Sequence, residues 1–180
     1  MDNLLPENSQ KKAGLGCGDE VIWVAMELLL IRHAKAEDFA MDDSSRVLTT
    51  KGHDQSRRVG EFLKDKQLVP DLTISSHYAR ARETAEIFCE AAGADVPLIE
   101  PWLACGMRPE RAMTELAAYR DFGRVAICGH NPDFACLAEW LVGSQAGGIH
   151  VKKASIIHFS HVHPPRQGAY LEMMLPVAML

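Results

Sequence analysis

The sequence predicts an α/β fold, a three-layer α/β/α sandwich around one mostly parallel sheet. Two observations predict it. Short apolar runs of strand type alternate along the chain with longer segments in which apolar residues recur every three or four positions. Polar loops, with neither an internal repeat nor a linker, separate these segments. Repeated alternation of strand and helix is typical of parallel strands joined by helices that cover both faces of a sheet.

Six strands are expected, each marked by an apolar or β-branched run between polar residues. The first run reads "MELLLI", and the fourth, "RVAIC", ends on a glycine and a histidine. The last two runs are separated by a turn that contains proline and glycine. The predicted strands cover residues 26–31, 71–76, 96–100, 124–128, 154–163 and 170–177.

Four helices are expected between these strands. Residues 49–66 place Val59, Phe62 and Leu63 on one helical face, and the helix from about residue 78 repeats apolar residues at the same spacing. A third helix is expected over 108–119. The fourth begins after the fourth strand, where Asn131 suits an N-cap and Pro132 a first helical position.

The composition is that of a soluble globular chain and excludes several kinds of function. The chain has 180 residues, of which 47% are hydrophobic, enough to bury the core of one domain. Its net charge of -5 argues against a broad surface for nucleic acid. No apolar run is long enough to span a membrane, and no secretory signal is recognisable. Five cysteines at no metal-ligand spacing indicate reduced thiols and a cytoplasmic location.

The first 20 residues are polar and glycine-rich, so we expect a flexible tail over 1–20 and a single domain over 21–180. The apolar residues 21–23 would be costly to leave in water, which favours their packing on the domain. The alternative is that translation naturally starts at Met26, and the sequence leaves open whether residues 1–25 belong to the native protein.

Three predicted strands end on side chains that suit an anion. Arg32 and His33 follow the first strand, the string "SSHYARARET" follows the second, and His130 follows the fourth. Ligands of such sheets lie beyond the carboxyl ends of the strands. Arginines, histidines and the amides of two helix starts would form a pocket for a tetrahedral dianion such as phosphate. Each residue alone would be ordinary, but their coincidence at three strand ends predicts a phosphate site.

Four segments carry a resemblance to a known family: "LLLIRHAKAE", "LTTKG", "DLTISSHYARARETA" and "ICGHNPDF". In order and spacing they resemble the signature segments of the histidine phosphatase superfamily, and within it the short SixA-type phosphohistidine phosphatases. The resemblance covers residues 26–175 and implies a phosphoglycerate mutase-like fold and no cofactor or metal. The opening motif of the family is usually Arg-His-Gly, whereas Ala34 stands at its third position here.

The resemblance implies that His33 is a nucleophile that is transiently phosphorylated on a ring nitrogen. A neutral imidazole is nucleophilic near neutral pH, which agrees with this role. Arg32, Arg80 and His130 would bind the phosphoryl oxygens and stabilise charge during transfer. The family's spacing selects Arg80 rather than the neighbouring arginine. Asn131 belongs to the candidate substrate-binding set, although helix capping is an alternative role for it.

Larger members of the superfamily carry an acidic proton donor, for which Glu100 after the third predicted strand is the candidate. An exposed loop glutamate is the alternative. Phosphohistidine needs less help from an acid than a phosphoester does, because it leaves more easily. The expected activity is therefore removal of phosphate from phosphohistidine on a signalling protein, such as a histidine-containing phosphotransfer domain. A small phosphoester substrate, or a non-catalytic phosphate-binding module, is the alternative.

Two other patterns suggest different chemistry. Cys105 and Arg111 have the Cys-x5-Arg spacing of cysteine-dependent phosphatases. The intervening loop contains a proline, which has no amide to donate, and a glutamate, which would repel phosphate. His158, His161 and His163 cluster near the C-terminus, but no carboxylate or thiol stands at ligand spacing. We therefore favour a solvated strand end over a metal site.

Overall fold

A six-stranded sheet runs through the structure, a computed structural model that describes residues 25–144 and 146–180. The predicted tail over 1–20, and the proposed packing of residues 21–23, lie outside the described residues. The strands are β1 (Met26–Arg32), β2 (Leu72–Ser75), β3 (Leu98–Ile99), β4 (Arg124–Gly129), β5 (Ile156–Val162) and β6 (Tyr170–Leu175). The α-helices are α1 (Thr50–Asp65), α2 (Ala79–Ala92), α3 (Pro109–Leu116) and α4 (Asp133–Leu141).

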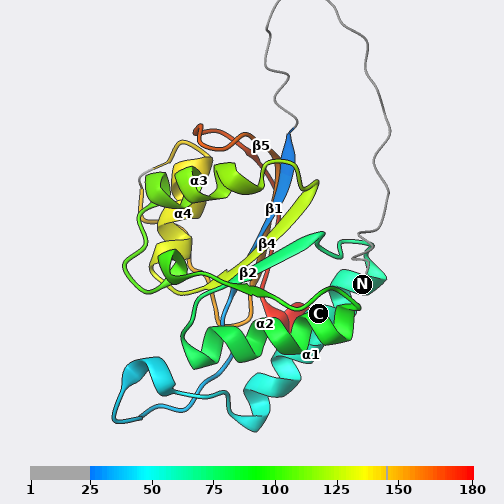
Figure 1. Cartoon of the computed structure of the whole chain (residues 1–180), viewed down its shortest axis with the longest axis vertical. Helices are drawn as coiled ribbons and strands as arrows, with labels where there is room; N and C mark the ends of the chain where they lie inside the picture. The colour runs from blue at the N-terminus through cyan, green and yellow to red at the C-terminus, as the bar shows by residue number, and fades with distance from the viewer. Residues whose placement is uncertain (1–24, 145) are drawn as a thin grey trace, which may run out of the picture.

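The strand order is β3-β2-β4-β1-β5-β6. Strands β1, β2, β3 and β4 pair in parallel, while β5 runs antiparallel to both β1 and β6. Helices α1 and α2 cover one face of the sheet, and α3 and α4 cover the other (Figure 1). The predicted three-layer α/β/α architecture with a mostly parallel sheet is confirmed.

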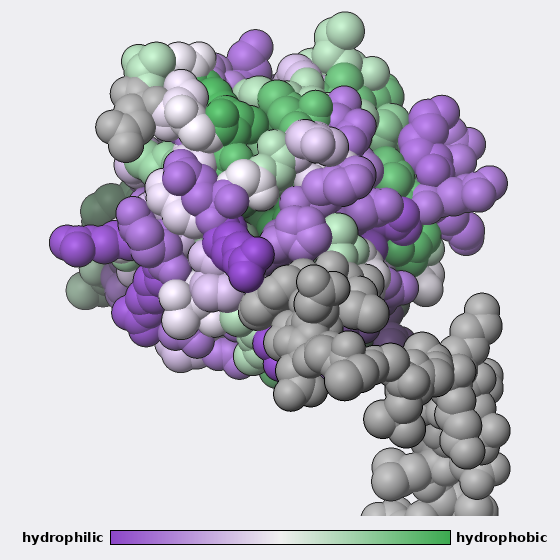
Figure 2. Space-filling model, turned by 90° about the horizontal axis from the view of Figure 1, so that it is seen from above, coloured by the Kyte–Doolittle hydropathy of each residue, from purple (hydrophilic) through white to green (hydrophobic). Residues whose placement is uncertain are grey.

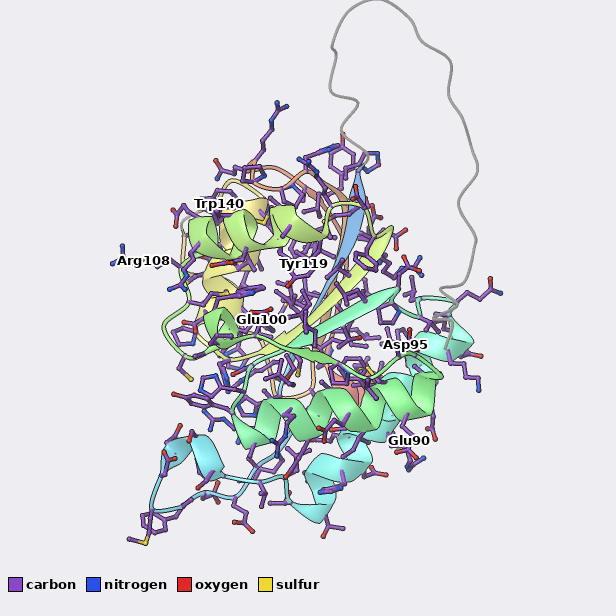
Figure 3. The ribbon with its side chains drawn as sticks, viewed as in Figure 1. Glu90, Asp95, Glu100, Arg108, Tyr119 and Trp140 are labelled. Atoms are coloured by element: carbon purple, nitrogen blue, oxygen red, sulfur yellow. The ribbon has the colours of Figure 1, made fainter. Side chains whose placement is uncertain are left out.

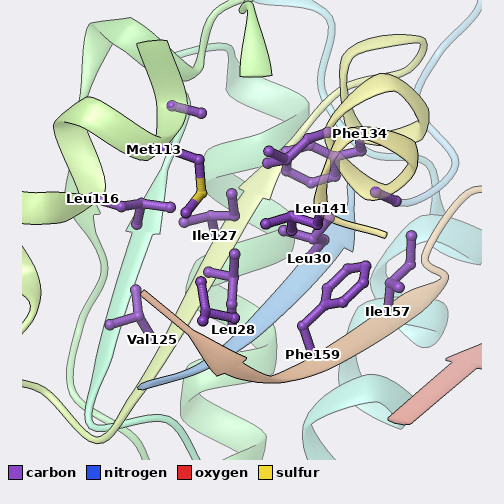
Figure 4. Close-up of a cluster of buried hydrophobic side chains, with 14 of the residues drawn as sticks. Leu28, Leu30, Met113, Leu116, Val125, Ile127, Phe134, Leu141, Ile157 and Phe159 are labelled. Carbon is purple, nitrogen blue, oxygen red and sulfur yellow. The ribbon is translucent and has the colours of Figure 1, made fainter. Parts of the chain in front are cut away.

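The two faces of β1 explain why its apolar run is continuous. Leu28 and Leu30 point into the layer of α3 and α4, and Leu29 and Ile31 point into the layer of α1 and α2. All four are fully buried. A strand covered on both sides has no polar face, so it does not show the alternation of a half-buried strand. Figure 4 shows the first layer, where residues of α3 and α4 meet the strands.

A glycine allows the helices of the second layer to approach closely. Gly60 of α1 lies against α2, and a Cβ atom at this position would stand 2.3 Å from the carbonyl oxygen of Phe88. No side chain fits there, which explains a glycine inside a long helix. The N-terminus of α1 is closed by Thr49, whose hydroxyl accepts from the amide of Gly52 at 3.2 Å.

The predicted helix boundaries need two corrections. The third helix is shorter than expected, because α3 ends at Leu116 and continues as the 3-10 turn η3 (Ala117–Tyr119). The fourth begins at Asp133, with Pro132 and not Asn131 at the N-cap. The Oδ1 atom of Asn131, which a cap would use as acceptor, has no hydrogen-bond partner within the described residues, and its side-chain nitrogen donates to the carbonyl of Val151 at 3.3 Å.

No helix among residues 25–144 and 146–180 is long and apolar enough to cross a membrane. The face seen in Figure 2 mixes hydrophilic with hydrophobic residues, as is usual for the surface of a globular domain.

Candidate active site

The register of the sheet brings the three predicted strand ends together. Arg32 at the end of β1 pairs with Gly129 at the end of β4, and Ser75 of β2 pairs with the preceding residue of β4. The amide of His33 continues the ladder by donating to the carbonyl of Gly129 at 3.0 Å. The rings of His33 and His130 consequently lie 5.3 Å apart, centroid to centroid.

His33 is held as a neutral imidazole with a defined tautomer. Its Nδ1 atom lies 2.9 Å from the carbonyl oxygen of Ala34. Because a carbonyl can only accept, Nδ1 carries the proton and Nε2 carries the lone pair. Burial, followed by the charges of His130 and Arg80, lowers the pKa of His33 to about 3. A neutral ring with an unprotonated Nε2 is the form that attacks phosphorus.

His130 is oriented by a serine whose role the sequence did not reveal. Its Nε2 atom lies 2.9 Å from the hydroxyl of Ser76, the residue that follows β2. Burial, followed by the charge of Arg80, lowers the pKa of His130 to about 3. The sequence signal for Ser76 was its place at the end of the second predicted strand, within the string "SSHYARARET".

Arg80 lies in the first turn of α2 and is only 3% exposed. Its Nη1 donates to the carbonyl of Asp43 at 2.7 Å, and its Nη2 to the carboxylate of the same residue at 3.0 Å. Arg82 is mostly exposed and pairs with Glu86 one turn on. The structure therefore places Arg80, and not Arg82, among the strand ends.

A threonine joins α2 to the end of β1. The hydroxyl of Thr84 accepts from the amide of Ala34 at 3.0 Å and donates to the carbonyl of Arg80 at 2.6 Å. In the sequence, Thr84 served as part of a helical stripe and as a marker of the family's spacing from Arg80, and no hydrogen-bonding role was predicted for it. Its hydroxyl fixes the residue after His33 relative to the helix that carries Arg80.

The carbonyl of Val151 braces the other side of the site. It accepts from Nη1 of Arg32 at 2.7 Å and from the side chain of Asn131 at 3.3 Å. The amide of Ala154 donates to the carbonyls of Arg32 and His33, at 3.1 and 3.3 Å. The loop before β5 thus fixes the orientation of two predicted site residues.

Buried polar atoms without a partner concentrate in this region. Among the described residues, five buried side-chain nitrogen or oxygen atoms have no hydrogen-bond partner. Four of them belong to predicted site residues: Nε of Arg32, Nε of Arg80, Nδ1 of His130 and Oδ1 of Asn131. Such atoms are costly unless a ligand or solvent satisfies them. Two guanidinium groups beside two neutral histidines suit a phosphoryl group.

Comparison with known proteins gives the same family. Residues 28–103 match the histidine phosphatase superfamily (branch 1). An uncharacterised protein from Picosynechococcus sp. is 31% identical over 141 residues, which cover 73% of this chain and 83% of that protein. The chain belongs to the histidine phosphatase superfamily.

Two SixA proteins are similar to this chain, one in sequence and one in structure. The Escherichia coli phosphohistidine phosphatase SixA is 36% identical over 61 residues, which cover 34% of this chain and 38% of SixA. The solved structure of the protein histidine phosphatase SixA complexed with tungstate shares the fold, with a TM-score of 0.77 at 20% identity. That match covers 85% of this chain and 98% of the SixA chain.

Glu100, the candidate proton donor of this histidine phosphatase superfamily member, has a hydrogen-bond partner in η3. Oε1 of Glu100 accepts from the hydroxyl of Tyr119 at 3.2 Å. Figure 3 shows both residues together on the α3 side of the sheet. By contrast, the carboxylate of Asp43 pairs with a predicted site residue, Arg80. The role of Glu100 as proton donor stays a prediction.

The Cys-x5-Arg string does not form a phosphate loop. The amides of Gly106 and Met107, which would have to cradle the anion, both donate to Oδ2 of Asp133 at 2.8 and 3.2 Å. Arg111 is exposed and pairs with the next turn of its own helix. Burial raises the pKa of the Cys105 thiol, which opposes formation of a thiolate.

The three C-terminal histidines have separate surroundings. His158 lies 3.2 Å from the carboxylate of Glu27, and the ring of His161 lies 4.7 Å from that of Tyr170. Within residues 25–144 and 146–180, no three His, Cys, Asp or Glu side chains gather in an arrangement that could hold a metal ion.

Proposed function

We propose that this protein is a phosphatase that works through a phosphorylated His33 and removes phosphate from phosphohistidine on another protein. The observation that carries the proposal is the state of His33. Its ring is neutral, its Nδ1 is bonded to Ala34, and its Nε2 is left to react beside Arg80 and His130. This combination suits nucleophilic attack on phosphorus.

The reaction has two steps. In the first, Nε2 of His33 attacks phosphorus, the P–N bond of the substrate breaks, and its electron pair returns to the leaving imidazole, which takes a proton from water. In the second, water attacks the phosphorus of phosphorylated His33, and the P–N bond to Nε2 breaks and returns its electron pair to the ring. Inorganic phosphate leaves, and the proton lost by the attacking water neutralises the hydroxide left by the first step. Arg32 and Arg80 stabilise the negative charge on the equatorial oxygens in both steps. His130 offers its Nδ1 atom to the same group.

The packing of residues 101–119 supports a protein substrate. This segment lies between β3 and β4, the stretch in which we expected a cap over the site if one were present. Instead, Trp102, Leu103, Met113 and Leu116 are buried in the core on the α3 and α4 face of the sheet. A free sugar phosphate needs enclosure and several convergent polar groups. Because this segment forms no cap, we expect the site to accept a side chain presented by a protein.

The hydrogen-bond partners of Glu100 and Asp43 support a leaving group that needs little help from a general acid. Glu100 is bonded to Tyr119, and Asp43 is bonded to Arg80. Desolvation opposes the shift, but a hydrogen bond from Arg46 and the charge of Arg80 lower the pKa of Asp43. An alkoxide must be protonated as it leaves, whereas an imidazole is a much better leaving group. The name of the tungstate-bound relative, a protein histidine phosphatase, points to the same substrate class.

A side-by-side turnover assay tests the proposal. We expect kcat/KM on a phosphohistidine protein, or on phosphoramidate, to exceed that on alkyl phosphates by at least about tenfold, or roughly 1.4 kcal/mol of transition-state stabilisation. Better turnover of one sugar phosphate would overturn the substrate class but leave the His33 mechanism standing. A folded protein that turned over none of these compounds, but still bound phosphate, would indicate a binding module.

A further inference from the structure

Two large apolar side chains are strongly exposed on the loop that follows His33. Phe39 is 80% exposed and Met41 is 102% exposed, relative to an extended reference residue. They stand on the loop between β1 and α1, a few residues after His33. Single exposed apolar residues are common, but two neighbouring side chains with this exposure indicate a contact surface. We call residues 37–43 the acidic loop.

The acidic loop is held in place, so the exposure does not come from a loose segment. Ala36 and Leu48 form an antiparallel bridge at its base, and the amide of Glu37 donates to the carbonyl of Val47 at 3.0 Å. Nη1 of Arg46 donates to the carbonyl of Glu37 at 3.0 Å. In Figure 1 the loop projects from the domain beside the start of α2.

The far end of the acidic loop is bonded to the active site itself. Asp43, two residues after Met41, accepts from Arg80 through both its carbonyl and its carboxylate. Arg80 is one of the two arginines proposed to bind the phosphoryl group. A protein whose phosphohistidine reached His33 would therefore come next to the loop that carries Phe39 and Met41.

The charge of the acidic loop indicates which partner fits. Four of its seven residues, "EDFAMDD", are acidic and surround the two apolar side chains. Lys35 pairs with Asp38 and Arg46 pairs with Asp43, so two of these charges are balanced at the base. Glu37 and Asp42 are exposed. An acidic border favours a partner with lysine or arginine side chains and disfavours an acidic one.

We infer that the acidic loop is the docking surface for the phosphorylated protein, which presents an apolar patch bordered by lysine or arginine next to its phosphohistidine. This inference rests on the proposed function and names the surface that the substrate contacts. The phosphoryl group itself would be bound by the strand ends, while the loop would add affinity only for a protein. Small phosphoramidates would not reach Phe39 or Met41.

The test compares two substrates on one double variant, Phe39→Ser/Met41→Ser. The protein probe is a histidine-containing phosphotransfer domain whose phosphohistidine is bordered by apolar and lysine residues, and the small probe is phosphoramidate. We expect kcat/KM on the protein probe to fall at least about tenfold, and that on phosphoramidate to stay within about twofold. Val96→Ser is the matched control, because Val96 is 87% exposed and lies before β3, and it should change neither value.

Several outcomes would overturn the inference. An unchanged rate on the protein probe would show that the two side chains contact no substrate, and an equal loss on both probes would place the loop in the chemistry. A wild-type dimer that the double variant converts to a monomer, measured by light scattering, would show a contact between two copies. Inactivity of the wild type on both probes would instead reject the proposed function.

A second variant tests the charge argument. Glu37→Lys reverses one exposed charge of the acidic loop and leaves the apolar pair in place. We expect a lower kcat/KM on the lysine-bordered protein probe, with the difference from wild type shrinking as salt is added. Phosphoramidate turnover should not change. A Glu37→Lys variant equal to wild type at low salt would contradict charge complementarity.

Discussion

Nδ1 of His33 donates to the carbonyl of Ala34, and this one bond decides which nitrogen of the ring can react. A carbonyl never donates, so the proton stays on Nδ1 while Nε2 keeps its lone pair. Burial keeps the ring neutral by lowering its pKa to about 3. The chain thus supplies a reactive imidazole without a neighbouring carboxylate to orient it.

The two buried histidines predict how stability depends on pH. Burial lowers the pKa of both His33 and His130 to about 3, whereas the unfolded chain titrates near 6.5. The unfolded state therefore binds protons that the folded state does not, so stability is present above pH 6.5 and is lost as pH falls toward 3. We expect Tm to fall between pH 7 and 5, and to fall less in His130→Ala. His53→Ala, which removes an exposed imidazole from α1, should keep the wild-type slope.

The contrast between two arginines of α2 predicts a selective loss of activity. Arg80 is buried at the strand ends, while Arg82 is mostly exposed and pairs with Glu86. Arg80→Lys keeps the charge but loses the planar fork, so we expect kcat/KM to fall by roughly 100-fold or more. Arg82→Lys should stay close to wild type. Equal effects of the two changes would contradict the placement of Arg80 in the site.

Anion binding should stabilise the folded protein. Phosphate or tungstate would satisfy buried nitrogen atoms of Arg32, Arg80 and His130 that have no partner within the described residues. A ligand at 100 times its Kd adds about 2.7 kcal/mol of stability, which thermal unfolding would record as a higher Tm. Arg80→Gln should remove the shift, and Arg82→Gln should keep it. A shift of wild-type size in Arg80→Gln would place the anion elsewhere.

The sequence was sufficient for the fold and the strand-end residues because both depend on local patterns. Apolar runs and helical stripes revealed the layers, and Arg32 and His33 directly continue a buried strand. The partners of these residues depend on distant segments. His130 bonds to Ser76 across 54 residues, and Arg80 to Asp43 across 37. Such contacts arise only when the sheet forms, so neither Ser76 nor Asp43 could be assigned from its neighbours in the chain.

The same reason explains why two side chains have partners that the sequence did not predict. Asn131 stands where a helix cap would be expected, but its amide is directed to Val151, twenty positions later in the chain. Glu100 follows a strand as a catalytic acid would, but its carboxylate is bonded to Tyr119 of η3. In both cases the local position was suitable, and a partner from another element determined the direction of the side chain.

Trapping the phosphorylated protein tests the central claim most directly. Wild type, His33→Ala and Cys105→Ser would be mixed with phosphoramidate, quenched in alkali, under which phosphohistidine survives, and mapped by mass spectrometry and ³¹P NMR. The account predicts phosphate on Nε2 of His33 in the wild type and in Cys105→Ser, and none in a folded His33→Ala, whose turnover falls by several orders of magnitude. Phosphate on Cys105, or near-normal turnover by His33→Ala, would contradict it.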